Sequence, residues 1–352
     1  MRALVVHAPK DLRADDWQEA APGPGQVLVR TAAGGICGSD LHYYHHGGFG
    51  AVRLKQPMVL GHEVSGRVAE LGPDVAETFP GGLAVGDLVA VNPSRPCGAC
   101  RYCLEGLANH CLDMRFYGSA MPFPHIQGAF REALLVDAAQ CVKADGVTAG
   151  EAAMAEPLSV ALHAIRRAGP LLGKRVLVTG CGPIGVLTVL AARRAGAAEV
   201  VATDIEDRPL EHAAAAGADR TINVAGNVAR EADALAAYAA GKGHFDVLCE
   251  ASGAQPALVA GLGALRPRGV VVQLGLGGDM TLPMTQVTAK ELELRGSFRF
   301  HEEFPLAVEM IAKGLIQVKP LITHTIAFDD AVKAFELAGD RSQVMKAQIA
   351  FN

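Results

Sequence analysis

The chain has 352 residues, of which 50% are hydrophobic and 20% are charged, and its formal net charge is −5. This length predicts two domains, and this composition excludes an intrinsically disordered protein. The acidic balance, without blocks of like charge, excludes the basic surface that binding to nucleic acid or to an anionic membrane requires. No apolar run in the sequence is long enough to span a bilayer, so no membrane partner is expected.

The N-terminal apolar stretch is too short for a secretory signal and is followed at once by charges and a proline. We therefore expect a cytoplasmic protein in which the eight cysteines stay reduced and serve as metal ligands or as buried thiols. Cys141, Cys181 and Cys249 lie in apolar contexts, so we expect them to pack in the core.

The first 150 residues hold short segments that alternate or run apolar between Gly/Pro turns. Examples are residues 26–36, 63–71, 87–92 and 130–136. No long helix is evident there, so the pattern predicts an irregular, β-rich domain.

Two motifs in this region offer a set of metal ligands. Cys37 lies in GGICGSDLH, and His62 and Glu63 lie in LGHEV. A thiolate, an imidazole and a carboxylate can bind zinc and leave one position open for water or substrate. Glu156 could supply a fourth oxygen or bind the metal's water. The spacing alone also fits ordinary structural roles for each of these residues.

A proton relay could lie beside this set. A metal-bound alcohol has a lowered pKa, and its carbon can then give hydride to a nicotinamide. Ser39 and His42 follow Cys37 closely enough to carry the released proton to solvent, although both also suit plain turn positions. We expect Asp40 to orient His62.

Four further cysteines form a compact motif, Cys97, Cys100, Cys103 and Cys111. Thiolates at this spacing select zinc or an iron–sulfur cluster, and four of them leave no coordination position open. The motif therefore predicts a structural metal, with a disulfide pair or chance clustering as the alternative.

Helical composition returns at residues 151–169, and from about residue 174 apolar runs alternate with helical segments. Continuous Val/Leu/Ile runs between helices indicate parallel strands that are buried on both faces, as in a doubly wound α/β sheet. After about residue 294 the pattern is strand, helix, strand, helix and strand, over residues 295–300, 302–314, 324–328, 329–340 and 346–351.

The first strand of this region runs into Gly180-Cys181-Gly182-Pro183-Ile184-Gly185, which opens a helix. This setting is what a dinucleotide-binding G-x-G-x-x-G loop requires, because the helix N-terminus receives the pyrophosphate. Asp204 ends the next strand, where a carboxylate binds the adenosine ribose hydroxyls and repels a 2′-phosphate. NAD is therefore expected, while the nearby Arg208 keeps NADP open. The alternative is a degenerate fold that binds no nucleotide.

In their order along essentially the whole chain, these motifs resemble the zinc-containing medium-chain dehydrogenase/reductase superfamily. CGSDLHYYHHG, and the glutamate at position 156 where other alcohol dehydrogenases place a cysteine ligand, resemble its polyol dehydrogenase branch. The stretches NPSRPCGACRYC, DMRFYGSAMPFPH and QVMKAQIAF resemble the L-idonate 5-dehydrogenases, which interconvert L-idonate and 5-keto-D-gluconate.

The resemblance implies a Rossmann doubly wound parallel sheet together with a β-rich GroES-like catalytic domain. The expected domains are residues 1–155 (catalytic, with both zinc sites), 156–293 (dinucleotide-binding) and 294–352 (returning to the catalytic domain). It also implies two zinc ions per chain, bound by Cys37, His62 and Glu63 with Glu156, and by the four-cysteine motif. A homodimer or homotetramer is expected.

The resemblance further implies contacts to substrate and coenzyme. Tyr43 and Arg299 match positions near a polyol substrate, and Arg115 and Arg299 are candidates for an aldonate carboxylate, with His125 a weaker one. The implied coenzyme contacts are Gly180, Gly182, Pro183, Ile184, Gly185, Asp204, Arg208, Leu274, Gly275 and Leu276. One departure is Pro209, which occupies a position where sorbitol dehydrogenases often carry arginine.

The predicted function is a zinc- and NAD(P)-dependent dehydrogenase that acts on a secondary alcohol of an aldonate such as L-idonate. A sorbitol- or xylitol-type polyol dehydrogenase is the first alternative. A non-catalytic nucleotide-binding redox sensor would lack Cys37, His62 or Ser39, and all three are present. A nucleic-acid-binding zinc module would need a basic, aromatic patch that the sequence does not contain.

Overall fold

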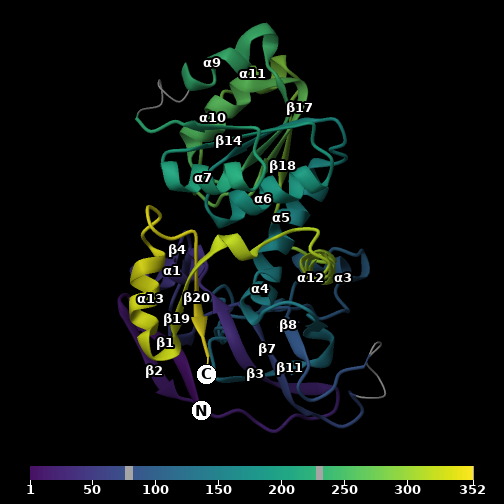
Figure 1. Cartoon of the computed structure of the whole chain (residues 1–352), viewed down its shortest axis with the longest axis vertical. Coiled ribbons are helices and arrows are strands. Elements are labelled where there is room, and N and C mark those ends of the chain that lie inside the picture. Colours follow the sequence, from purple (N-terminus) through teal and green to yellow (C-terminus); the bar gives the residue numbers. More distant parts are fainter. Residues whose placement is uncertain (76–81, 227–232, 352) are drawn as a thin grey trace. The chain divides into compact units, whose positions relative to one another are not determined.

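The structure is a computed structural model that describes residues 1–75, 82–226 and 233–351. It divides into two compact units (Figure 1). The first unit contains residues 1–156 and 304–340 and the C-terminal segment from Lys346 onward, and the second contains Pro157–Glu303 and Arg341–Met345. Among the described residues, no helix is both long enough and apolar enough to cross a membrane.

A mixed sheet forms the centre of the first unit. Its strand order is β12 (Cys141–Lys143), β8 (Leu88–Val91), β7 (Glu63–Leu71), β3 (Gln26–Gly35), β20 (Lys346–Ala350) and β19 (Ile322–Ala327), and β11 (Ala133–Asp137) also pairs with β3. A smaller sheet joins β2 (Asp11–Asp16), β1 (Arg2–Ala8) and β6 (Met58–Val59). Short strands β4 (Gly48–Phe49) and β5 (Val52–Arg53) pair with each other.

Side chains of β3 alternate between buried and less buried positions along most of the strand, as expected for a strand with one face on a core. Its contact with β7 is close, because a Cβ on Gly66 would collide with the backbone of Arg30. Helix α1 (Gly38–His46) follows β3 directly, and the sequence pattern had not predicted it. Helices α4 (Ala149–Ala153) and α13 (Ala331–Ala338) also belong to the first unit, as does α12 (Glu303–Ala312) from Phe304 onward.

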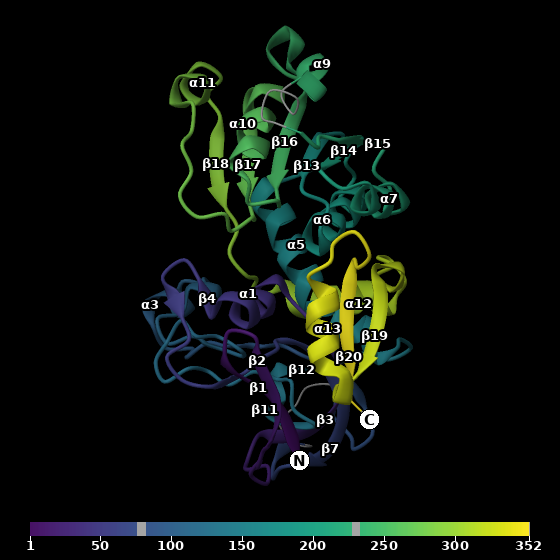
Figure 2. The same ribbon diagram turned by 90° about the vertical axis from the view of Figure 1, so that its left-hand side faces the viewer.

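The second unit is a six-stranded parallel sheet (Figure 2). The strand order is β15 (Arg220–Asn223), β14 (Glu199–Asp204), β13 (Arg175–Thr179), β16 (Phe245–Glu250), β17 (Leu265–Gln273) and β18 (Glu293–Gly296). In chain order this is 3-2-1-4-5-6, the doubly wound arrangement, so the predicted fold class is confirmed. The helices are α5 (Ala155–Ala168), α6 (Pro183–Arg194), α7 (Asp207–Ala215), α9 (Ala236–Ala239), α10 (Gln255–Ala264) and α11 (Met284–Ala289).

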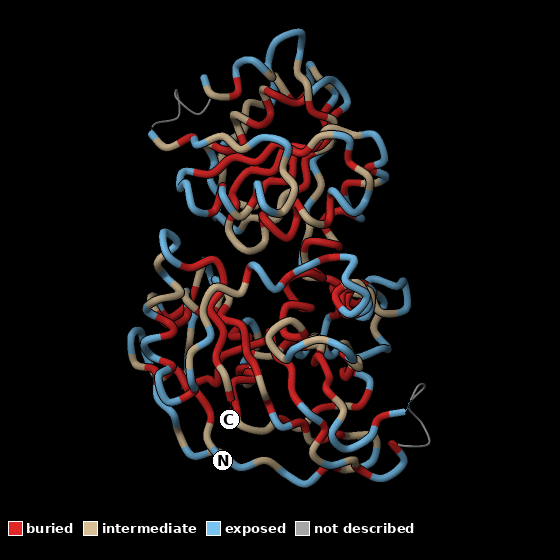
Figure 3. The backbone as a smooth tube through the Cα atoms, viewed as in Figure 1, coloured by how far each residue is buried: buried red, intermediate tan, exposed pale blue. Residues whose placement is uncertain are grey.

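Buried positions concentrate along the central strands of each unit (Figure 3). In the second unit, Leu177, Val201 and Leu248 on three neighbouring strands are fully buried and pack against Leu258 and Leu262 of α10. Continuous apolar strands are expected where helices cover both faces of a parallel sheet.

The tail leaves the second unit later than the expected boundary at residue 294. Strand β18 extends the parallel sheet by pairing with β17, from Val270 opposite Glu293 to Gln273 opposite Gly296. Residues up to Glu303 therefore group with the second unit, and the change to the first unit comes at Phe304. A further five residues, Arg341–Met345, also group with the second unit.

Glu303, the first residue of α12, is bound to α5. Its carboxylate lies 3.2 Å from His163 Nδ1, accepts a hydrogen bond from Arg166 Nη1 at 3.0 Å and accepts one from the backbone N–H of His301 at 2.8 Å. Burial opposes ionisation of this side chain, but the hydrogen bonds from His163 and His301 outweigh it and lower the pKa of Glu303 to about 2.

We therefore expect Glu303→Gln to lower the free energy of unfolding at pH 7 by up to about 3 kcal/mol. The folded-state pKa lies below the usual value, so this stabilisation is present above pH 4.5 and is lost as pH falls toward 2. Urea unfolding should show the gap between wild type and variant narrowing as pH falls from 5 to 3. The neighbouring, exposed Glu302→Gln is the control, and an equal loss there would contradict the assignment.

Candidate active site

The site in the first unit begins where β3 ends. Gly35 is the last residue of β3 and Cys37 is the N-cap of α1. Asp40 is fully buried, and its two carboxylate oxygens accept hydrogen bonds from the backbone N–H groups of Cys37 and Gly61, each at 3.0 Å. Asp40 therefore ties together the two segments that carry the predicted ligands.

Strand pairing brings those ligands together. In the register of β3 and β7, Gly35 lies opposite Glu63, and His62 precedes Glu63 at the start of β7. A side chain at Gly35 would occupy the space of the Glu63 carboxylate, so this glycine makes room for it. As a result, one ligand atom each from Cys37, His62 and Glu63 lies within 4.8 Å of the others.

These three side chains fit a metal ion. His62 Nδ1 is buried and has no hydrogen-bond partner, which is uncommon for a polar atom in a protein interior. Sulfur, nitrogen and oxygen donors in a set of three are typical of zinc sites that keep a position open. Asp40 Oδ1 lies 3.8 Å from His62 Nδ1, beyond hydrogen-bond distance, so in this arrangement Asp40 acts on His62 through its charge.

The surroundings of the three ligands are strongly acidic. Burial raises the pKa of Glu156 to about 7, because the stabilising charge of His62 only partly compensates for burial and Glu63 adds repulsion. Burial alone would lower the pKa of His62, but the charge of Asp40 and the charge and hydrogen bond of Cys37 raise it well above its usual value. Several buried acids around one imidazole favour a bound cation.

Sequence reasoning missed Lys346, on β20. Its side chain is 3% exposed, and its Nζ donates hydrogen bonds to Glu63 Oε1 at 2.7 Å and to the carbonyl of Ile36 at 3.0 Å. Burial lowers the pKa of this amine, whereas the charges of Glu63 and Cys37 raise it, with a net increase. Lys346 thus compensates part of the negative charge and contacts both oxygens of Glu63, because its Nζ also lies 2.5 Å from Oε2.

The two predicted relay residues lie on α1. Ser39 is half-buried, while His42 is exposed and its ring lies 6.1 Å from that of His46. Partial burial, and then the charge of His46, lower the pKa of His42. An exposed imidazole with a pKa below its usual value can release a proton to solvent at neutral pH.

The predicted substrate residues have different surroundings. Tyr43 is 2% exposed and its hydroxyl accepts the backbone N–H of Ala120 at 3.0 Å. His125 is buried, with Nε2 at 2.8 Å from the N–H of Lys55 and Nδ1 at 2.9 Å from the carbonyl of Pro122, so both ring nitrogens are occupied.

The two predicted arginines are more accessible than those side chains. Arg115 is exposed on β10 (Arg115–Phe116), opposite Arg95 of β9 (Ser94–Arg95). Arg299 belongs to the second unit, has a positive φ of 54° and lies over the ring of Phe298 at 4.9 Å.

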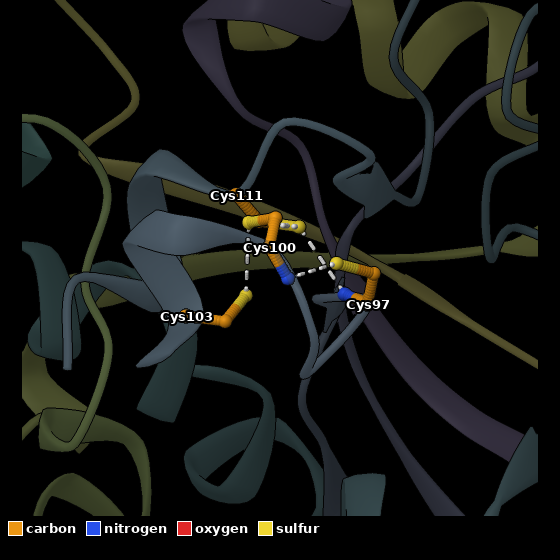
Figure 4. A group of neighbouring side chains, drawn as sticks. All are labelled: Cys97, Cys100, Cys103 and Cys111. Carbon is orange, nitrogen blue, oxygen red and sulfur yellow. Dashed lines mark hydrogen bonds between the residues drawn. The ribbon is translucent and has the colours of Figure 1, made fainter. Parts of the chain in front are cut away.

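The four-cysteine motif also converges (Figure 4). All four ligand atoms lie within 4.8 Å of one another, and the Sγ of Cys100 is 3.5 Å from that of Cys103 and 4.0 Å from that of Cys111. These separations exceed a disulfide bond of about 2.05 Å, but match the roughly 3.8 Å between sulfurs bound tetrahedrally at about 2.3 Å from zinc. Backbone N–H groups of Leu112 and Cys103 lower the pKa of Cys100 to about 6, which favours the thiolate.

The predicted coenzyme loop in the second unit follows β13. Gly180 has a φ of 83°, and a Cβ there would lie 2.6 Å from the backbone nitrogen of Ser252. Gly182 is the N-cap of α6 and Pro183 its first residue, so the free N–H groups of the first turn are available to an anion. Asp204 ends β14 as expected and is buried, whereas Arg208 is exposed on α7.

Residues 274–276 follow the end of β17, and Leu276 is 79% exposed. Glu250, a fully buried residue that sequence reasoning missed, holds the start of this segment, because its backbone carbonyl accepts the N–H groups of Leu274 at 2.8 Å and Gly275 at 2.9 Å. Its carboxylate fixes the residues beside the segment. It accepts hydrogen bonds from the N–H of Ser252 at 2.8 Å, from that of Gly253 at 3.0 Å and from Gln273 Nε2 at 2.6 Å. The only signal in the sequence was an acid at the end of the apolar run FDVLCE.

The alcohol dehydrogenase GroES-like domain family matches residues 23–146, and the zinc-binding dehydrogenase family matches residues 183–313. L-idonate 5-dehydrogenase (NAD(P)(+)) of Escherichia coli K12 is 46% identical over 330 residues, covering 92% of each chain. Human sorbitol dehydrogenase is 39% identical over 338 residues, covering 95% of this chain and 91% of the relative.

The fold also matches solved structures. The crystal structure of E. coli L-idonate 5-dehydrogenase has a TM-score of 0.90 and 42% identity, and the match covers 99% of this chain and 98% of that one. Two structures at 28% identity and a TM-score of 0.87 carry coenzymes: a protein of E. coli CFT073 with NADH, and a zinc-binding dehydrogenase of Sinorhizobium meliloti with NADP. The first match covers 100% of this chain and 99% of that one, and the second 99% and 98%. The chain therefore belongs to the zinc-binding alcohol dehydrogenase family and is an NAD(P)-dependent oxidoreductase.

Proposed function

We propose that the chain oxidises a secondary alcohol of an aldonate, L-idonate to 5-keto-D-gluconate, with NAD(P) as hydride acceptor, and catalyses the reverse reaction. The observation that carries the chemistry is the grouping of Cys37, His62 and Glu63, in which the buried His62 Nδ1 has no hydrogen-bond partner. The substrate is supported by the 46% identity to the E. coli L-idonate 5-dehydrogenase.

In this proposal Cys37, His62 and Glu63 hold a zinc ion, and Glu156 supplies a further oxygen or binds the ion's water. When bound, the ion lowers the pKa of an alcohol hydroxyl so that hydride can leave its carbon. Lys346 keeps Glu63 in place by contacting both of its oxygens. Ser39 takes the hydroxyl proton and His42 passes it to solvent, which the exposure of His42 supports.

The second unit binds the coenzyme, through Gly180, Gly182, Pro183, Ile184, Gly185, Asp204, Arg208 and residues 274–276. NAD is the proposed coenzyme, with NADP as an alternative. Cys97, Cys100, Cys103 and Cys111 hold a second zinc ion with a structural role. We also propose a cytoplasmic homodimer or homotetramer, as the family resemblance suggests.

Purified protein should be assayed with NAD and NADP on L-idonate, D-gluconate, sorbitol and xylitol, and in reverse with 5-keto-D-gluconate. We expect the largest kcat/KM on L-idonate and about two zinc ions per chain. Preference for sorbitol or xylitol would support the second candidate, a polyol dehydrogenase, which the 39% identity to human sorbitol dehydrogenase favours. Turnover of none of these compounds would contradict both.

Arg115 is proposed to bind the aldonate carboxylate, which sorbitol lacks. Arg115→Ala is expected to lower kcat/KM on L-idonate by roughly 10- to 100-fold, because a charge-assisted bidentate contact is lost. Activity on sorbitol should change little. Arg95→Ala is the matched control, because Arg95 lies opposite Arg115 and is already paired with Asp137 at 2.6 Å. An equal loss on both substrates would remove Arg115 from this role.

A further inference from the structure

A short segment near the C-terminus brings a cation to the coenzyme loop. Arg341–Met345 lies in sequence between α13 and β20 of the first unit but groups with the second unit. Arg341 Nη2 lies 3.2 Å from Asp204 Oδ2, and a Cβ added to Gly182 would lie 3.5 Å from the same nitrogen. One guanidinium is therefore next to both the carboxylate that ends β14 and the N-cap of α6.

The carboxylate of Asp204 is already held by the protein. Oδ2 also accepts the backbone N–H of Cys181 at 2.6 Å, and Oδ1 accepts those of Ile205 at 2.8 Å and Glu206 at 3.1 Å. Its side chain is 2% exposed. Asp204 was expected to repel a phosphate because of its negative charge. In the structure, the positive charge of Arg341 compensates that negative charge.

Arg341 still has N–H donors that a ligand can use after it pairs with Asp204. Its side chain is 52% exposed, and its ion pair with Asp204 uses one nitrogen of the guanidinium. A guanidinium has five N–H donors in a planar fork that matches phosphate oxygens, and the bond to a buried carboxylate limits its rotation. The N-terminus of α6 beside it adds a positive dipole end.

We propose that Arg341 is a phosphate-binding residue of the coenzyme site, held in position by Asp204. The phosphate is that of the coenzyme's adenosine half, either the pyrophosphate or the 2′-phosphate of NADP. This inference rests on the proposed function only in requiring that the second unit binds a dinucleotide, and it is independent of the substrate. In this proposal, the preference for NAD or NADP depends on both Asp204 and Arg341, and not on Asp204 alone.

Titration calorimetry on the full-length protein with adenosine, 5′-ADP and 2′-AMP tests the proposal. In Arg341→Ala we expect the Kd for at least one phosphate-bearing probe to rise roughly tenfold, with adenosine unchanged, and Arg341→Lys should recover part of the loss. A loss on 5′-ADP assigns the pyrophosphate, and a loss on 2′-AMP assigns the 2′-phosphate.

Arg266→Ala is the matched control. Arg266 is 44% exposed and pairs with Asp246 at 2.7 Å, near the starts of β17 and β16, at the opposite end of the strands from Gly182. It should bind every probe as wild type does. Unchanged affinities in Arg341→Ala, or an equal loss on all three probes including adenosine, would overturn the proposal while leaving the proposed function intact. If wild type binds none of the probes, the inference and the coenzyme part of the proposed function both fail.

Discussion

Replacing Cys37 by serine is expected to lower kcat/KM by roughly a thousandfold or more and to remove about one zinc ion per chain. A serine hydroxyl is protonated at neutral pH and is a poor zinc ligand, so the remaining imidazole and carboxylate would hold the ion weakly. The backbone of the site should survive the change, because the Asp40 carboxylate accepts a hydrogen bond from the backbone N–H of residue 37, which serine keeps. The measurements are steady-state kinetics with the proposed substrate and metal analysis of the dialysed protein.

The control for this variant is Cys141→Ala, which removes a thiol that belongs to neither cysteine-containing metal group. It should retain its metal content and its kcat/KM within about twofold, since only a small core side chain is trimmed. Binding of 5′-ADP by Cys37→Ser should also match wild type. A Cys37→Ser protein with wild-type turnover would contradict the proposed mechanism.

Sequence reasoning predicted those parts of the molecule that are encoded by residues close together in the sequence. The doubly wound sheet follows from apolar runs alternating with helices, and the position of Gly180–Gly185 at the end of β13 follows from six consecutive residues. The grouping of Cys37 with His62 was expected from motifs, but its physical cause, Gly35 opposite Glu63 in the sheet, depends on strand register. Register is set by tertiary pairing and cannot be read from either strand alone.

The parts that sequence reasoning missed depend on contacts between distant residues. Lys346 lies 283 positions from Glu63, and Arg341 lies 137 positions from Asp204. In the sequence, both are single cations near the C-terminus and look like ordinary polar residues. Only the return of the chain, first to the second unit and then into the β3–β7 sheet as β20, gives them carboxylate partners. The expected domain boundary at residue 294 lies before the change of unit at Phe304 for a related reason. Strand β18 pairs with β17 in the second unit before the chain returns to the first unit.

The segment that carries the four cysteines (residues 97–111, the four-cysteine lobe) should depend on its metal for stability. Its helices are too short to be stable on their own. Helix α3 (Arg101–Leu104) has four residues, none of them buried, and the 3₁₀ turn Ala108–His110 has three. Leu104, Leu107 and Leu112 are 76%, 45% and 67% exposed, so these leucines add little to a core. In such a segment the free energy of metal binding takes the place of hydrophobic burial.

Cys100→Ser is therefore expected to lose about one zinc ion per chain and to lower the thermal midpoint by several degrees, at roughly 2–4 °C per kcal/mol. Freed from the metal, the lobe should become cleavable by trypsin at Arg101, which limited proteolysis followed by mass spectrometry would detect. The kcat of the intact fraction should stay within about threefold of wild type, because Cys37, His62 and Glu63 belong to the other metal group. Two zinc ions per chain with an unchanged midpoint would show that the sulfurs cluster without binding a metal. If Cys100→Ser instead lost as much kcat as Cys37→Ser, the metal of the four-cysteine lobe would take part in the reaction.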